Sequence, residues 1–167
     1  MSQLPKPLPT SSKRPARRTL ATILGAAAAA ALLQFVPTQE GTVYKTYKDI
    51  GGVLTYCTGA TEDAIAGKVY TPAECSARLD YDLAVHAEGV MSCIKVPLTV
   101  GQKVAFVDTA YNIGIAGFCN SSMARKTNAG DRVGGCQALK LWVKVQGKVV
   151  RGLVLRRERV MAYCLKD

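Results

Sequence analysis

Three residues near the start of the polar part of the chain have side chains that together can split a glycosidic bond. Glu40 is the first acidic residue, Asp49 follows nine positions later, and Thr55 lies six positions further on. A protonated carboxyl can give its proton to a leaving oxygen, while a carboxylate beside a hydroxyl can hold the attacking water. The spacing therefore indicates a candidate catalytic set, with Glu40 as general acid and Asp49 and Thr55 as the pair that orients water.

The surroundings of the two carboxyl groups differ in a way that supports these roles. An apolar run ends just before Glu40, and apolar surroundings favour the neutral form of a carboxyl. Asp49 follows Lys48 in a polar turn, which favours the ionised form. The alternative is that Asp49 only caps the turn over residues 50–52. These three residues taken alone leave both interpretations open.

The elements that must position this set are a hairpin and several helices. Residues 43–58 place β-favouring residues on both sides of Gly51 and Gly52, which predicts a short β-hairpin with Asp49 and Thr55 on its two arms. Caps and glycines then predict helices over residues 71–88, from 99 to the glycines at 114 and 117, from 121 or 122 to 130, from 131 onward, and over 152–165. The expected fold class is α+β, with a small β-hairpin lobe and a larger helical lobe.

The first part of the chain is typical of an exported protein. Residues 1–19 form a basic, proline-rich tail that we expect to be disordered, and residues 20–36 are apolar and rich in alanine. That run is about as long as the shortest membrane-spanning helices, roughly 17 residues, and its basic flank predicts a cytoplasmic N-terminus. A cleaved signal peptide, a permanent anchor and a weak, uncleaved anchor that can leave the membrane all remain open. The expected division is 1–19, 20–37 and a folded domain over 38–167.

Charge and cysteine content narrow the class of partner and the compartment. The net charge is +10, but residues 19–167 hold 17 basic and 12 acidic residues. That moderate excess suits an acidic polymer and is weak evidence for nucleic acid, which we do not expect as a partner. All six cysteines follow the apolar run without a CxxC pair, which favours disulfides in an oxidising compartment over a metal site.

Several motifs beyond the first three residues resemble those of the phage-type lysozymes. They are TYCTGAT (55–61), FVDTAYNIGIAGFCNSSMARKTNAGD (106–131), and Trp142 followed by GLVLRRE (152–158). Together with the spacing of Glu40, Asp49 and Thr55, they extend the resemblance over residues 38–167. The resemblance implies a lysozyme-like fold and an inverting endolysin that hydrolyses the β-1,4 bond between N-acetylmuramic acid and N-acetylglucosamine.

The resemblance also implies further residues, partners and a location. Gly59, Tyr111 and Ser121 correspond to substrate-binding positions of the family, and no metal or other cofactor is expected. The expected partners of a monomeric enzyme are the glycan strands of peptidoglycan and, through residues 20–36, the inner membrane. Some phage lysozymes carry a similar weak N-terminal helix as a signal-anchor-release element, which implies tethering at the inner membrane and later release into the periplasm.

Other expectations concern cysteines and single side chains. The cysteine count leaves the pairing open, and sequential pairing is the hypothesis: Cys57–Cys75, Cys93–Cys119 and Cys136–Cys164. Trp142 is expected in the core, the lone His86 on a solvated helix face without chemistry, and Arg156, Arg157 and Glu158 in ion pairs on a helix surface. Two other functions remain: a lytic transglycosylase, which Asp49 and Thr55 disfavour, and a non-catalytic, membrane-tethered protein that binds the cell wall.

Overall fold

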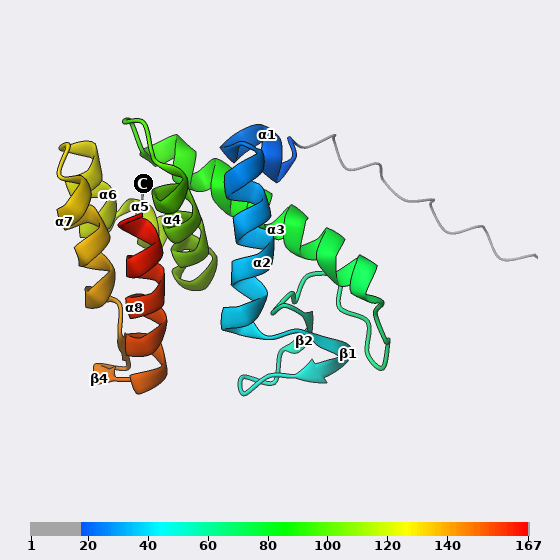
Figure 1. Ribbon diagram of the computed structural model, residues 1–167. Helices are drawn as coiled ribbons and strands as arrows, with labels where there is room; N and C mark the ends of the chain where they lie inside the picture. Colours follow the sequence, from blue (N-terminus) through cyan, green and yellow to red (C-terminus); the bar gives the residue numbers. More distant parts are fainter. Residues whose placement is uncertain (1–17, 167) are drawn as a thin grey trace, which may run out of the picture.

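The computed structural model describes residues 18–166, so residues 1–17 of the predicted basic tail lie outside it. The β-hairpin lobe and the helical body form distinct parts of the molecule, and α3 runs between them (Figure 1). In chain order the elements are α1 (Leu20–Leu24), α2 (Ala26–Glu40), β1 (Val43–Lys48), β2 (Leu54–Cys57), α3 (Pro72–Cys93), α4 (Val100–Ile113), α5 (Ile115–Cys119), α6 (Ser122–Asn128), α7 (Arg132–Gln137), the 3₁₀ helix η1 (Ala138–Leu141), β3 (Lys144–Val145), β4 (Lys148–Val149) and α8 (Arg151–Cys164).

The segment predicted as a single membrane helix forms two helices, α1 and α2. Gly25 separates them with a φ of +91°, a conformation that L-residues with side chains rarely adopt. Lys103 of α4 donates to the carbonyl of Leu24 over 2.9 Å and so ties the end of α1 to the helical body. Across residues 18–166, no helix combines the length and apolar character that crossing a bilayer requires. The apolar side chains of the segment instead lie in the core: Leu20, Leu24, Ala28, Ala29, Leu32 and Val36.

The predicted hairpin is confirmed as the antiparallel pair β1–β2. Tyr47 lies opposite Thr55 in its register, so Thr55 lies on β2, whereas Asp49 directly follows β1 at the start of the turn. The small lobe has its own core, in which the rings of Tyr56 and Tyr70 stack with centroids 4.2 Å apart. A lobe of this size gains its rigidity from such local contacts and from its attachment to α3.

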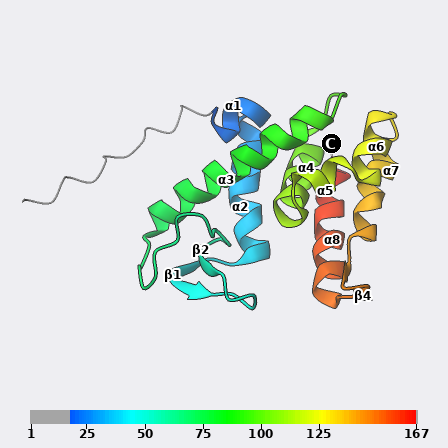
Figure 2. The same cartoon turned by 180° about the vertical axis from the view of Figure 1, so that it is seen from behind.

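Helix α3 attaches the hairpin lobe to the helical body. Its predicted capping box is present, because the Thr71 hydroxyl accepts from the Glu74 N–H and the Glu74 carboxylate accepts from the Thr71 N–H. The helix continues to Cys93, past the end predicted at residue 88, since Val90 extends its buried stripe into the core. Seen from behind, α3 crosses in front of α2 and reaches from the hairpin to the helical body (Figure 2).

The helical lobe follows the predicted caps, with one addition. Thr99, Ser121 and Asp131 each accept a backbone N–H at the start of α4, α6 and α7. The β3–β4 hairpin before α8 was not predicted. Its turn residues Gln146 and Gly147 have positive φ angles of 49° and 77°. Each strand has only two residues, which is too short for an alternating pattern to be recognised.

Three disulfides join the elements that carry the site. The sequential pairing hypothesis is confirmed: Cys57–Cys75 links β2 to α3, Cys93–Cys119 links α3 to α5, and Cys136–Cys164 links α7 to α8. Each bridge restricts the unfolded chain, which stabilises the folded state by about 2–4 kcal/mol per bridge. The bridges hold the hairpin lobe and the last helix against the central helices.

One glycine permits the close approach of α4 to the end of α8. A Cβ built on Gly101 would lie 2.3 Å from the Tyr163 carbonyl oxygen and 2.7 Å from that of Lys166. Both are backbone atoms, which cannot move aside as a flexible side chain can. The docking of α8 on α4 therefore depends on the missing side chain at this position.

Substituting Gly101→Ala should lower the free energy of unfolding by about 1–3 kcal/mol, because the methyl group overpacks a rigid contact. Gly152→Ala is the matched control, since a Cβ at Gly152 near the start of α8 meets nothing within 4 Å. Urea unfolding of the two variants and the wild type measures the difference. Equal stability of both variants would contradict the close contact.

Candidate active site

Glu40 is the last residue of α2, where a carboxylate needs a compensating cation. The carbonyl end of a helix carries partial negative charge, which disfavours a second negative group beside it. Gly41, with a φ of +73°, ends the helix and turns the chain toward β1. Arg156 of α8 supplies the cation, with its Nη1 2.6 Å from Glu40 Oε1. The Glu40 side chain is 26% exposed, so it remains accessible to a ligand.

Arg156 is also bound to a second carboxylate deeper in the protein. Its Nη2 lies 3.1 Å from Asp108 Oδ1, and the side chain of Asp108 is fully buried on α4. Burial raises the pKa of the Asp108 carboxyl above its usual range, and the guanidinium of Arg156 opposes that rise. One arginine thus joins α2, α4 and α8 and fixes the position of Glu40.

Arg157 supports the same region from the next position in α8. Its Nη2 donates to Asn112 Oδ1, and its Nε donates to the carbonyl of Trp142 over 3.0 Å. Trp142 packs against the hydrophobic core, as predicted. The interpretation of Arg156 and Arg157 as surface ion-pair partners was wrong, because both side chains are buried. The signal was present in the helical period, since position 157 lies on the buried stripe of Val160 and Cys164.

The two candidate water-binding residues occupy the β1–β2 hairpin. Asp49 is exposed at the end of β1, and its Oδ1 accepts the Val53 N–H over 2.8 Å. The turn-capping role considered for Asp49 is therefore present in the structure. Thr55 is buried on β2, and its hydroxyl donates to the Val53 carbonyl over 3.0 Å. One oxygen of Asp49 is thus held by the turn while its carboxylate stays open to solvent.

Glu40 opens into a cavity of about 380 Å³ between the two lobes. Gly59 and Tyr111, two of the expected substrate-binding residues, lie in its lining. Ser121 lies outside this lining. Its hydroxyl caps α6 and donates to the Phe118 carbonyl over 2.6 Å. Asp49 and Thr55 lie outside the lining as well, in the hairpin that leads into it. The residues around the cavity are Glu40, Thr58, Gly59, Ala60, Thr61, Arg78, Asp82, His86, Tyr111 and Asn112.

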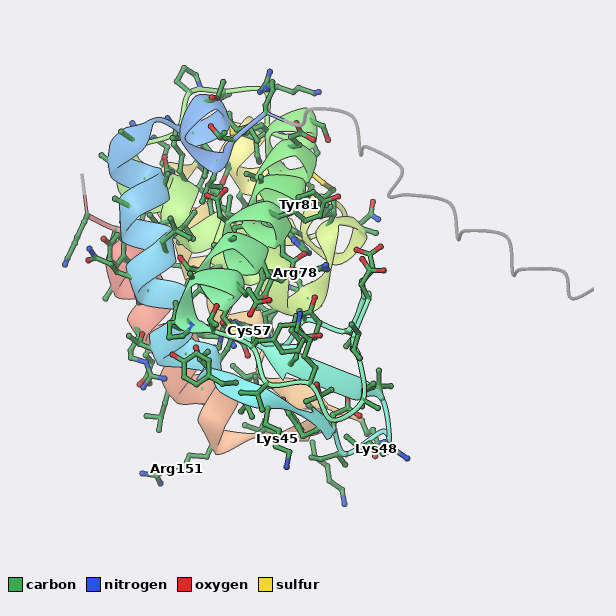
Figure 3. All side chains as sticks on the ribbon, turned by 90° about the vertical axis from the view of Figure 1, so that its right-hand side faces the viewer. Lys45, Lys48, Cys57, Arg78, Tyr81 and Arg151 are labelled. Atoms are coloured by element: carbon green, nitrogen blue, oxygen red, sulfur yellow. A yellow bond between two sulfur atoms is a disulfide. The ribbon has the colours of Figure 1, made fainter. Side chains whose placement is uncertain are left out.

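The α3 wall of the cavity carries a polar cluster without a counterpart among the predicted site residues. Arg78 Nε lies 2.9 Å from Asp82 Oδ2, and its Nη2 lies 3.2 Å from Glu62 Oε2. Figure 3 shows Arg78 on the part of α3 that faces the hairpin lobe, above the outward-pointing Lys45 and Lys48. His86, one turn beyond Asp82, is partly buried in the same wall.

His86 was expected on a solvated helix face, whereas the structure places it partly buried in the cavity wall. Residue 86 lies next to the buried stripe of Leu79, Leu83 and Val90, and that helical period was the available signal. Tyr111, on the facing helix α4, donates its hydroxyl proton to the carbonyl of Thr58. Burial raises the pKa of the Tyr111 phenol, so this donor stays protonated over the whole neutral range.

The arrangement suits acid-catalysed cleavage of a polar polymer. Within residues 18–166, no three His, Cys, Asp or Glu side chains gather as metal ligands. The cavity instead offers an accessible carboxyl with a buried counter-ion, and hydrogen-bonding groups on its other walls. Such a site can bind a saccharide strand and protonate a bridging oxygen.

Replacing Arg156→Gln should lower the free energy of unfolding by about 3–5 kcal/mol, because it leaves the buried Asp108 carboxyl without its partner. Arg159→Gln is the control on the same helix, where an exposed arginine only donates to Gln39. That change should cost less than about 1 kcal/mol. Chemical denaturation at pH 7 gives the free energy of unfolding of the two variants and the wild type. A decrease below about 1 kcal/mol for both variants would show that the buried pair does not stabilise the fold.

Comparison with known proteins shows the family of this chain. The model of the Phage lysozyme family matches residues 37–160. A SAR-endolysin of Bacteriophage PS119 is 42% identical over 127 residues, which cover 75% of this chain and 76% of the relative.

Two solved structures are similar to most of this chain. The muramidase domain of SpmX from Asticaccaulis excentricus has a TM-score of 0.77 and 28% identity, over 82% of this chain and 96% of that domain. The endolysin from Escherichia coli O157:H7 phage FAHEc1 has a TM-score of 0.74 and 28% identity, over 86% of this chain and 93% of its own. The fold, the motifs and the matched residues lead to one conclusion: this chain belongs to the phage lysozyme family.

Proposed function

We propose that this protein is a phage endolysin that hydrolyses the β-1,4 bond between N-acetylmuramic acid and N-acetylglucosamine in peptidoglycan. The observation that carries the proposal is the Glu40 carboxyl, which opens into the interlobe cavity and is held from behind by buried Arg156. A glycan strand in that cavity would place its bridging oxygen beside a carboxyl group whose position is fixed. The SAR-endolysin relatives and the muramidase-domain neighbour support the same activity.

In this mechanism the carboxyl of Glu40 protonates the leaving oxygen of the glycosidic bond. Asp49 and Thr55 hold and orient the attacking water from the hairpin side. Asp49 has one oxygen engaged by the Val53 N–H, which fixes the carboxylate while its exposed side remains available to water. The hydroxyl of Thr55 on β2 donates to the Val53 carbonyl, so its oxygen would accept a hydrogen bond from that water.

The Glu40→Gln variant should lose activity by at least about a hundredfold, because the amide cannot donate the catalytic proton. Clearing of a peptidoglycan suspension by the full chain measures the rate, and Glu158→Gln, on the exposed face of α8, is the matched control. Asp49→Asn should also be strongly impaired, since it keeps an acceptor for Val53 but removes the charge. Full activity of Glu40→Gln would contradict the mechanism, and anhydro products from the wild type would indicate a lytic transglycosylase.

We further propose that residues 20–36 act as a signal-anchor-release element. The basic flank would direct export with the N-terminus inside, and the segment would tether the enzyme to the inner membrane until it leaves the bilayer. While it is inserted, Glu40 would be held at the membrane surface, away from Asp49 and Thr55. The low hydrophobicity of the alanine-rich segment supports release, and so does its buried position in the folded protein.

If release rather than cleavage produces the active enzyme, the soluble, active protein should retain residues 20–36. The physical reason is that Leu20, Leu32 and Val36 are buried in the core, so their removal would open large cavities. N-terminal sequencing and intact mass of the periplasmic enzyme test this expectation. An active, soluble form that begins after the alanine tract would establish a cleaved signal peptide instead.

A further inference from the structure

His86 is held in the α3 wall of the cavity in a defined orientation. Its Nδ1 lies 2.7 Å from the carbonyl oxygen of Asp82, one turn earlier in the same helix. A carbonyl oxygen can only accept a hydrogen bond, so Nδ1 must carry a proton and donate it. In the neutral imidazole this leaves Nε2 as an acceptor with a free lone pair.

The position of the ring directs this acceptor away from the helix. Because Nδ1 turns back toward the α3 backbone, Nε2 lies on the opposite edge of the ring. The ring also packs nearly perpendicular to Tyr111 of α4, at 74° and 5.2 Å between centroids. His86 thus contributes a restrained nitrogen to the wall of the cavity that contains Glu40.

The other charged and polar groups of this region decide which ligand the nitrogen suits. Arg78 is engaged by the carboxylates of Asp82 and Glu62, and the Tyr111 hydroxyl by the Thr58 carbonyl. The Asp82 carboxylate lies in the same wall and is already paired with Arg78, so the charge of that arginine is not left for an anionic ligand. A neutral group with O–H or N–H donors fits this wall better.

We propose that His86 is a specificity-determining residue, whose Nε2 accepts a hydrogen bond from a hydroxyl or acetamido N–H group of the amino-sugar strand. The inference rests on the proposed function, because it requires a glycan strand in the cavity beside Glu40. The role of His86 is binding and not proton transfer, so its loss weakens substrate binding while the chemical step proceeds at its normal rate.

His86→Phe tests this role, because phenylalanine keeps a ring against Tyr111 and removes the acceptor. With soluble peptidoglycan fragments, KM should rise about fivefold to tenfold, because one hydrogen bond to the substrate is lost. The value of kcat should change less than about twofold. His86→Gln supplies a new acceptor and should recover part of the affinity. Ser92→Ala, an exposed polar change near the end of the same helix, should leave KM and kcat unchanged.

A spectroscopic measurement tests the same contact without turnover. His86 is the only histidine of the sequence, so ¹⁵N-imidazole NMR of the full chain gives one unambiguous pair of signals. In the Glu40→Gln protein we expect the Nδ1–H tautomer, and an upfield shift of Nε2 when a tetramer of N-acetylglucosamine is added. The tetramer replaces peptidoglycan here because it lacks carboxylates.

The outcomes separate this inference from the proposed function. An unchanged KM for His86→Phe, or an Nε2 signal that stays in place while the tetramer shifts the Tyr111 amide, would overturn the role of His86. Wild-type protein that neither clears peptidoglycan nor binds the tetramer would overturn the proposed function itself. A folding defect in His86→Phe would appear as a lowered melting temperature, and the NMR measurement then decides.

Discussion

The buried guanidinium of Arg156 is the constraint on which the rest of the site depends. A cation removed from water is tolerated only when carboxylates and hydrogen bonds surround it, and here Glu40 and Asp108 supply them. These partners come from α2 and α4, while the arginine comes from α8. The interaction therefore exists only when all three helices are docked. Glu40 faces the cavity in a fixed position because the helical core has formed behind it.

That docking depends on features far from the cavity itself. The end of α8 approaches α4 closely at Gly101, and the Cys136–Cys164 disulfide fastens the same end to α7. Phe35 of α2 meets Tyr163 of α8 with ring centroids 5.3 Å apart, which brings the two helices together beyond the ion pair. The apolar residues of α1 and α2 complete this core. If residues 20–36 are first held in a membrane, as proposed, the core and the Arg156 cluster would form together upon release.

The opposite side of the cavity is built by different means. The hairpin lobe is fastened to α3 by the Cys57–Cys75 disulfide and rests on the stacked rings of Tyr56 and Tyr70. Helix α3 adds the polar wall of Arg78, Asp82 and His86, whose side chains are fixed mainly by contacts with one another and with their own helix. One wall thus holds the Glu40 carboxyl and the other offers hydrogen-bonding groups, which suits a saccharide strand between them.

Much of this architecture could be predicted from local patterns. The capping boxes at Thr71 and Thr99 and the glycines around the first hairpin are short-range signals, because the atoms that satisfy each other lie a few residues apart. The order of Glu40, Asp49 and Thr55, together with the other motifs, indicated the family for a similar reason, since it needs no knowledge of packing. The two-residue strands of the second hairpin were too short to leave such a signal.

The environment of each side chain was decided by tertiary structure. The helical period of α8 places Arg157 on the stripe of Val160 and Cys164, and the docking of α8 on α2 and α4 buries Arg157 together with Arg156. His86 lies in the cavity wall because the face of α3 that carries it packs against Tyr111 of α4. By composition the apolar run 20–36 is compatible with a weak membrane anchor and with a protein core. Which of the two surrounds it in the folded protein follows from the long-range contacts of Leu20, Leu32 and Val36 with the other helices.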